Sequence, residues 1–165
     1  EEVGSASAAG AQGPFLKAVL ERLCETAEGF HRAMARSILV STDNAHGIHP
    51  SYPDRHDSQH APIINKGPAI KINTNQRYAT SSETAAIFSQ VCEEAKVPVQ
   101  NFVARNDMGC GSTIGPITAT LLGVRTVDVG VPTFAMHSIR ELAGVEDVGY
   151  LEKALGRFFQ YTEHE

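Results

Sequence analysis

Acidic and histidine side chains in three separated segments are the residues of this chain that could do hydrolytic chemistry. Glu1 and Glu2 open the 165-residue sequence, Asp43 and His46 bound an Asp-Asn-Ala-His segment, and His137 lies in a Met-His-Ser-Ile-Arg-Glu segment. Carboxylates and neutral imidazoles are common zinc ligands. If these segments meet in space, they could hold zinc and leave one carboxylate free to move protons.

Each of these residues, taken alone, also has an ordinary structural interpretation. The Glu1-Glu2 pair could be solvated, Asp43 could form an Asx-turn or cap a helix, and His137 could be a hydrogen-bonded structural histidine. Two adjacent glutamates in an extended segment point to opposite sides, so one could bind metal while its neighbour handles protons. The combined pattern therefore matters more than any single residue.

Composition and charge exclude several classes of protein. A content of 42% hydrophobic and 20% charged residues is enough for the core of one domain. The net charge of -5, without a basic stripe, argues against a general nucleic-acid binder. Cys24, Cys92 and Cys110 are odd in number and lack zinc-knuckle spacing, which predicts reduced thiols in a cytosolic setting. No apolar stretch is long enough to span a bilayer.

Hydrophobic spacing predicts that helices and strands alternate along the chain. Helices are expected over about 6–27, 82–95, 117–122 and 147–159, and strands over 37–41, 68–72, 99–105 and 124–129. Asp43 directly follows the first strand, at the kind of strand end where open α/β sheets place their sites. The last helix is expected to pack Val148, Leu151, Leu155 and Phe158 onto the sheet.

Two loops carry residues with more than one interpretation. The loop over 44–65 contains His49, His56 and His60, which could form a third metal site, although their spacing favours solvent-exposed loop histidines. The glycine-rich turn over 109–116 lacks the lysine of a phosphate-binding P-loop. Cys110 in this turn could be a nucleophile, but a small buried thiol is the favoured interpretation.

A series of short segments forms a more specific pattern. They are Glu1-Glu2-Val3-Gly4-Ser5, Asp43-Asn44-Ala45-His46, His49-Pro50, Lys66-Gly67-Pro68, Lys71, Gln76-Arg77-Tyr78, Arg105-Asn106-Asp107, Ser112-Thr113-Ile114-Gly115-Pro116 and Ala135-Met136-His137-Ser138-Ile139-Arg140-Glu141. With these segments, nearly the whole chain resembles the aspartyl aminopeptidase family of cocatalytic zinc exopeptidases.

The resemblance implies a role for each candidate residue. Glu1 corresponds to the general base, Glu2 and His137 to ligands of one zinc ion, and Asp43 to the terminal ligand of a second. The family also uses an upstream histidine and an upstream bridging aspartate, and neither position exists in these 165 residues. This segment alone is therefore expected to lack a complete metal site and to bind zinc weakly.

The resemblance also implies a substrate pocket. Lys71 and Tyr78 correspond to residues that hold the side-chain carboxylate of an N-terminal acidic residue. His46, three residues after Asp43, is placed to assist at the substrate carbonyl or carboxylate, and it could equally support the residues that contact the substrate. For Lys71, the structural alternative is an outward-facing position on an alternating strand.

The family likeness sets the expected fold and function. The fold is a three-layer α/β/α zinc exopeptidase domain with a mixed sheet, of which residues 1–165 form the C-terminal portion, without the upstream strands and the dimerisation insert. The intact protein is expected to be a cytoplasmic, homo-oligomeric aminopeptidase with two zinc ions, releasing Asp, and less readily Glu, from peptide N-termini. The competing hypothesis is a non-catalytic fragment or pseudoenzyme that serves as a binding or assembly module.

Overall fold

A mixed sheet lies at the centre of the computed structural model, which describes residues 4–162. Within these residues, the main sheet has four strands in the order β1-β5-β3-β4, namely β1 (Ile38–Thr42), β5 (Arg125–Gly130), β3 (Ala69–Ile72) and β4 (Gln100–Val103). The pairs β1/β5 and β3/β4 are parallel, whereas β3 and β5 are antiparallel. A smaller sheet joins β2 (Ala45–His46), β6 (Pro132–Phe134) and β7 (Leu142–Ala143).

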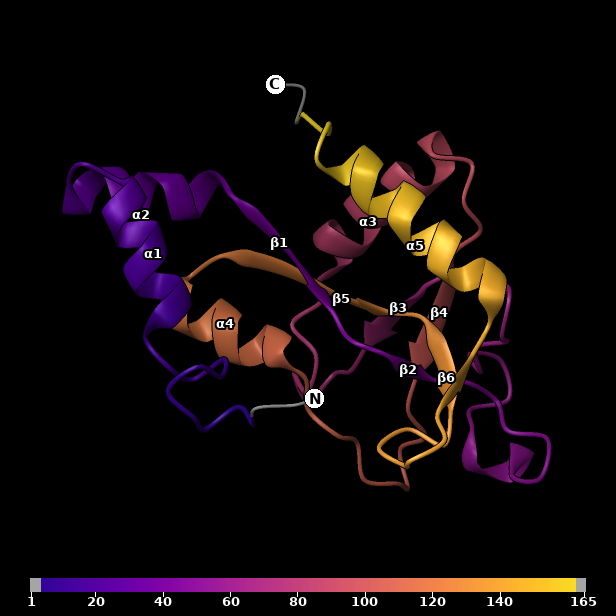
Figure 1. Ribbon diagram of the computed structural model, residues 1–165. Coiled ribbons are helices and arrows are strands. Elements are labelled where there is room, and N and C mark those ends of the chain that lie inside the picture. The colour runs from indigo at the N-terminus through magenta and orange to yellow at the C-terminus, as the bar shows by residue number, and fades with distance from the viewer. Residues whose placement is uncertain (1–3, 163–165) are drawn as a thin grey trace.

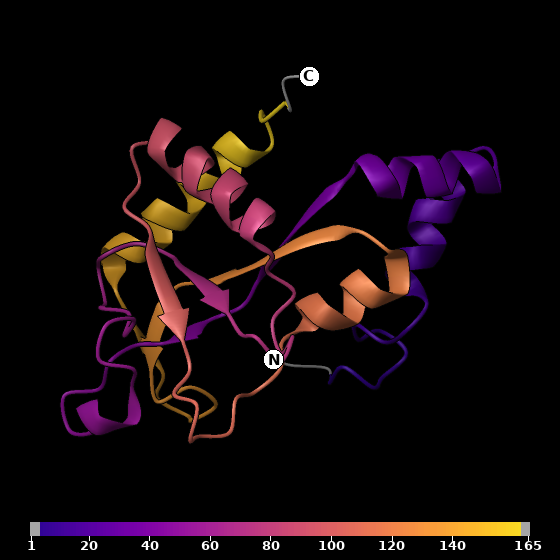
Figure 2. The same ribbon diagram turned by 180° about the vertical axis from the view of Figure 1, so that it is seen from behind.

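Helices cover both faces of the main sheet (Figures 1 and 2). One face carries α3 (Ser82–Glu94) and α5 (Val145–Phe158), and the other carries α4 (Ile114–Leu122). Beside α4 lie α1 (Phe15–Leu23) and α2 (Ala27–Arg36), and a short 3-10 helix, η1 (Pro53–Arg55), interrupts the loop after β2. This arrangement is the mixed α/β fold expected from the sequence.

Alternation along β5 separates the two faces of the sheet. Val127 and Val129 pack with Ile70 and Phe88 in the core beneath α3 and α5. Asp128 lies between these two valines, so its side chain points to the opposite face, where α4 packs. The apolar core and the polar side of the sheet therefore alternate residue by residue.

The helix α3 begins and is buried as the sequence predicts. The Ser81 hydroxyl accepts a hydrogen bond from the Thr84 N–H at 3.2 Å, and the Thr84 hydroxyl accepts one from the Ser81 N–H at 3.0 Å. This reciprocal capping satisfies two backbone donors that the helix itself cannot pair. Phe88 and Val91 then face the sheet, which fixes the orientation of the helix.

The expected helix over 6–27 is wrong. Turns and bends occupy 4–14, α1 begins only at Phe15, and a second helix, α2, follows after Thr26. Pro14 lacks a backbone N–H and is tolerated only at the start of a helix, so it ends the preceding irregular segment. The Thr26 hydroxyl accepts a hydrogen bond from the Gly29 N–H at 3.0 Å, which starts α2.

Smaller differences affect the last two helices. Val148 was expected on the sheet but is 63% exposed, whereas Tyr150 and Ala154 make the contact with the core. The helix α4 begins at Ile114 rather than at 117 because Pro116 lies in its first turn, where backbone N–H groups have no intrahelical partner.

Two further expectations can be compared with the structure. Cys24, Cys92 and Cys110 are all free thiols, as predicted. Among residues 4–162, no helix is both long enough and apolar enough to cross a membrane.

Candidate active site

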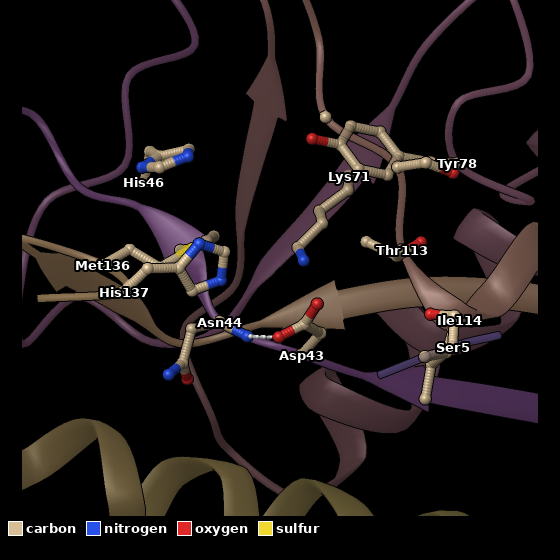
Figure 3. A pocket seen from close by; sticks show the side chains of 13 residues that line it. Ser5, Asp43, Asn44, His46, Lys71, Tyr78, Thr113, Ile114, Met136 and His137 are labelled. Atoms are coloured by element: carbon tan, nitrogen blue, oxygen red, sulfur yellow. Dashed lines mark hydrogen bonds between the residues drawn. The ribbon is translucent and has the colours of Figure 1, made fainter. Parts of the chain in front are cut away.

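A cavity of about 220 Å³ brings together residues from all parts of the chain (Figure 3). Its walls are formed by Ser5, Asp43, Asn44, Ala45, His46, Lys71, Tyr78, Gly111, Ser112, Thr113, Ile114, Met136 and His137. Asp43 follows the carboxyl end of β1, as predicted, and Lys71 comes from β3. Five of the seven predicted site residues therefore line one cavity, whereas Glu1 and Glu2 lie outside the described residues.

Local hydrogen bonds hold Asp43 at the cavity wall. Its N–H donates to the carbonyl of Val129 at 3.0 Å, which extends the pairing of β1 with β5 by one residue. One carboxylate oxygen, Oδ1, accepts a hydrogen bond from the Asn44 N–H at 2.8 Å. Within residues 4–162 the other oxygen has no hydrogen-bond partner, so it can act as a ligand or acceptor.

The loop after β6 presents His137 through an unusual backbone conformation. His137 has a φ of 67°, in the left-handed region, and Ala135 has a φ of 56°. The His137 N–H donates to the Glu141 carboxylate, which closes the loop. Non-glycine residues adopt this conformation at a cost, and such residues are often found at functional sites.

Two residues of the cavity have donor atoms of a kind that zinc can bind. Asp43 and His137 have suitable donor atoms and line the same cavity. Within residues 4–162, however, no three His, Cys, Asp or Glu side chains are grouped so as to hold a metal ion. A complete site would need further ligands beyond this described set.

Two of the loop histidines, His49 and His60, contact neighbouring side chains. The His49 ring lies against Tyr52 and Phe134, with centroid distances of 5.3 and 5.2 Å. His60 Nδ1 lies 2.8 Å from an oxygen of the Asp57 carboxylate. These contacts stabilise the long loop. The expectation that the loop histidines are solvent-exposed is wrong, because His49, His56 and His60 are all partly buried.

Lys71 is a buried cation, and no carboxylate within residues 4–162 forms an ion pair with it. Its residue is 2% exposed, so the alternative of an outward-facing lysine is wrong. The ammonium lies 5.5 Å from the centroid of the Tyr78 ring, and Figure 3 shows the side chain reaching into the cavity toward Asp43. Among the described residues, no hydrogen bond or ion pair to this ammonium is formed. A buried charge of this kind favours an anionic ligand.

Burial shifts the ionisation of the groups around this cation. Burial lowers the pKa of Lys71, while the negative charges of Asp43 and then Asp128 oppose the shift. Burial also raises the pKa of Tyr78, and contact with the Cys110 thiol adds to this effect. Tyr78 therefore remains a neutral phenol that can donate a hydrogen bond.

His46 stands at the edge of the same cavity. Burial lowers its pKa, the charges of Lys71 and His137 lower it further, and Asp43 opposes them. A neutral imidazole at this position can accept a proton or a hydrogen bond from a bound molecule.

The glycine-rich turn forms another wall of the cavity. Gly111, Ser112 and Thr113 line it directly, just before α4. Cys110 is half-buried and packs near Tyr78 and Phe102, so its surroundings are those of a packed thiol rather than of an activated nucleophile.

Sequence reasoning overlooked several residues of this region. Ser5, Asn44 and Met136 line the cavity; each lies in one of the short segments of the sequence pattern, but no role was predicted for them. Asp128 is buried directly behind the cavity and donates or accepts three hydrogen bonds there. An aspartate between two valines of a buried strand was a usable signal, because buried carboxylates require specific partners.

A protein-family model matches nearly the whole chain. Residues 1–159 match the family model described as Aminopeptidase I zinc metalloprotease (M18). The chain belongs to the M18 family. Within the described residues, the match includes both sheets and the helices α1 to α5.

Curated relatives are similar to the chain over nearly all of its length. The "Probable M18 family aminopeptidase 2" of Pseudomonas aeruginosa (strain LESB58) is 64% identical over 163 residues, or 99% of this chain. The protein of the same name from Azotobacter vinelandii is 62% identical over 159 residues, or 96% of the chain. The chain spans only 38% and 37% of the lengths of these two relatives.

Solved structures are similar to the chain in fold and in sequence. A chain in the cryo-EM structure of the Ape4 and Nbr1 complex is 46% identical, with a TM-score of 0.93, covering 97% of this chain and 31% of its own. The S. cerevisiae mApe1 dodecamer gives 32% identity and a TM-score of 0.83, covering 98% of this chain and 36% of its own. The M18 family aminopeptidase from Thermotoga maritima is 25% identical, with a TM-score of 0.79, and the match covers 95% of this chain and 37% of the Thermotoga chain.

Proposed function

We propose that the protein containing this chain is a zinc-dependent aminopeptidase that releases acidic residues, Asp and less readily Glu, from peptide N-termini. Membership of the M18 family supports the aminopeptidase reaction. The single observation that carries the acidic preference is the buried ammonium of Lys71 in the cavity wall. A carboxylate bound there would neutralise a charge that the described residues leave without an ion pair.

The substrate side chain would be recognised by complementary charge. Lys71 would donate to the carboxylate of an N-terminal Asp, and the neutral phenol of Tyr78 could donate a second hydrogen bond. A neutral or basic side chain would leave the buried ammonium unpaired, and sites of this kind discriminate strongly. His46, also on the cavity wall, would accept a hydrogen bond from the substrate backbone or support the bound carboxylate.

The reaction centre would lie beside Asp43 and His137. These two residues, with Glu2, would hold two zinc ions together with an upstream histidine and an upstream aspartate of the longer protein. When bound, zinc would act as a Lewis acid on the scissile carbonyl and lower the pKa of the attacking water. Glu1 would accept the proton from that water and deliver it to the departing amine, which is general base and then general acid catalysis.

Assembly and location form a further part of the proposal. We infer a homo-oligomer, which is supported by the dodecamer of the related mApe1. We place the protein in the cytoplasm because its three cysteines are free thiols.

One observation favours a second candidate function. Because no three-ligand group occurs within residues 4–162, a chain limited to this part could serve as a non-catalytic binding or assembly module. Such a module would retain the cavity but would not hydrolyse peptides.

The full-length protein distinguishes the two candidates. Release of aspartate from a peptide with N-terminal Asp is measured after treatment with chelator and again after zinc is added back. The aminopeptidase proposal predicts loss and recovery of activity, with the isosteric Asn peptide cleaved much more slowly. Activity that is absent under all conditions would support the non-catalytic module.

A further inference from the structure

Asp128 occupies the centre of a polar row that crosses the main sheet behind the cavity. Its residue is 0% exposed. Asp128 pairs with Ser41 where β5 runs beside β1. Where β5 runs beside β3, Ile70 pairs with Val129, so the next position places Lys71 beside Asp128. These three side chains point to the face that carries α4, opposite to the apolar core. The lysine that lines the cavity therefore has a buried anion as its neighbour.

The carboxylate of Asp128 also joins two walls of the cavity. The Thr113 hydroxyl donates to Oδ1 at 2.8 Å, and the Ala79 N–H donates to Oδ2 at 2.6 Å. The Asp128 N–H itself donates to the Thr80 hydroxyl at 2.9 Å. One residue thus fixes the turn before α4 and the segment that directly follows Tyr78.

The start of α4 is shaped around this carboxylate. A Cβ atom on Gly115 would lie 2.3 Å from both carboxylate oxygens, so only glycine allows the first turn of the helix to approach so closely. The Thr113 hydroxyl, at the N-cap position, bonds to Asp128 and caps no N–H of its own helix. The positive end of a helix dipole stabilises a nearby negative charge, which lowers the cost of burying Asp128.

We propose that Asp128 is the positioning residue for acidic-substrate recognition, because it orients Lys71 and Tyr78 and balances the buried ammonium when no substrate is bound. This inference rests on the proposed function of Lys71 and Tyr78. Asp128 lies behind the cavity wall and acts through these residues, without contacting the substrate itself. Its negative charge favours the protonated form of Lys71, together with that of Asp43. A substrate carboxylate would then bind to a cation that is already in place.

Asp128→Asn tests the charge with little change in shape. The Asn carbonyl can still accept from the Ala79 N–H, and its amide can donate to the Thr113 hydroxyl. In the full-length protein, we expect KM for the Asp peptide to rise by roughly tenfold or more, because charge-assisted interactions contribute at least this factor. We expect kcat to fall much less, and the kinetics on the Asn peptide to change little.

Asp147 provides a matched control. It is also 0% exposed and accepts hydrogen bonds from the N–H groups of Asn65 and Gly67 at 2.7 and 2.9 Å, but it does not line the cavity. Asp147→Asn should lower the melting temperature and keep the ratio of Asp to Asn peptide cleavage. If both variants keep the wild-type ratio, Asp128 is only structural and the inference is wrong.

A second pair of variants tests the positioning role of Asp128 if Asp128→Asn does not fold. Thr113→Val removes one hydrogen bond to Asp128, whereas Thr113→Ser keeps the hydroxyl. A higher KM for the Asp peptide in the Val variant, recovered in the Ser variant, would support the inference, and an equal KM in both would overturn it. A wild-type protein that cleaves peptides but does not prefer Asp over Asn would instead overturn the proposed specificity, and the inference with it.

Discussion

The two faces of the central sheet are built from alternate residues of the same strand but differ in chemistry. Beneath α3 and α5, Val127 and Val129 join Phe88 and Ile70 in a buried apolar cluster. On the face of α4, Asp128, Lys71 and Ser41 bring two charges and a hydroxyl into the interior. The first face gains stability from burial of apolar surface, whereas the second loses stability because charged groups leave water.

This difference indicates that one face of the sheet mainly stabilises the fold, whereas the other supports the cavity. The apolar face needs hydrophobic side chains that together fill the core volume, and it tolerates volume-conserving exchanges among them. The polar face needs particular partners: a hydroxyl at Thr113, an N–H at Ala79 and no side chain at Gly115. Substitutions on the apolar face should therefore change mainly the free energy of unfolding, whereas substitutions on the polar face should also change the ratio of Asp to Asn peptide cleavage.

The largest expected effect on stability comes from the apolar face. Phe88 is fully buried, so Phe88→Ala should lower the free energy of unfolding by about 3 to 5 kcal/mol, as large cavities in a core do. Denaturant unfolding of the full-length protein measures the loss. The folded fraction should keep the wild-type ratio of Asp to Asn peptide cleavage, and a large change in that ratio would mean that the two faces are coupled.

A smaller loss is expected at the start of α4. Gly115→Ala places a methyl group against the Asp128 carboxylate and should lower the free energy of unfolding by about 1 to 3 kcal/mol, the usual cost of overpacking. Gly149→Ala in α5 is the matched control, since no atom lies within 4 Å of its added Cβ. This control should be stabilised by about 0.5 to 1 kcal/mol, because alanine favours a helix more than glycine does. Equal effects of both substitutions would contradict the tight contact at Gly115.

The smallest effect on stability has the opposite sign. Lys71→Met removes a buried charge and should raise the free energy of unfolding at pH 7 by on the order of 1 kcal/mol. Because the folded-state pKa of Lys71 lies below its ordinary value of 10.5, the unfolded wild-type chain binds more protons between these two values. Wild-type stability therefore increases as the pH rises through this window, and the advantage of the Met variant should shrink toward pH 10.5.

Thermal unfolding of both proteins at pH 7 and near pH 10 measures this dependence. An advantage that grows with pH would show that the ammonium stabilises the folded state.

Long periodic elements of the fold were predictable from the sequence, and short ones were not. The helix after Ser81 and the strand before Asp43 were predicted within about one residue, because capping residues and apolar runs mark them. The break before Phe15 and the two-residue strands β2 and β7 depend on tertiary contacts, so local pattern did not reveal them. Exposure of Val148 was missed because helical spacing alone does not tell which of two adjacent stripes faces the sheet.

The candidate site was predictable where a motif marks it. The resemblance to aspartyl aminopeptidases placed Asp43, His46, Lys71, Tyr78 and His137 in one site, and the structure brings these five residues to one cavity. The roles of these residues, like those of Glu1 and Glu2, remain predictions. The position of Asp128 between two valines was a usable sign of a buried carboxylate, but its place beside Lys71 and Ser41 depends on pairing between strands distant in sequence, which a linear pattern does not show.

The ratio of Asp to Asn peptide cleavage in wild type and Lys71→Met shows whether Lys71 selects acidic substrates. The full-length protein is used with zinc added, and kcat/KM is measured for both peptides. We predict that the Met variant loses the preference for Asp by about a hundredfold or more, because a neutral pocket no longer pairs with the substrate carboxylate. A Met variant that keeps the wild-type ratio would contradict the assignment of Lys71, and with it the account of the polar face.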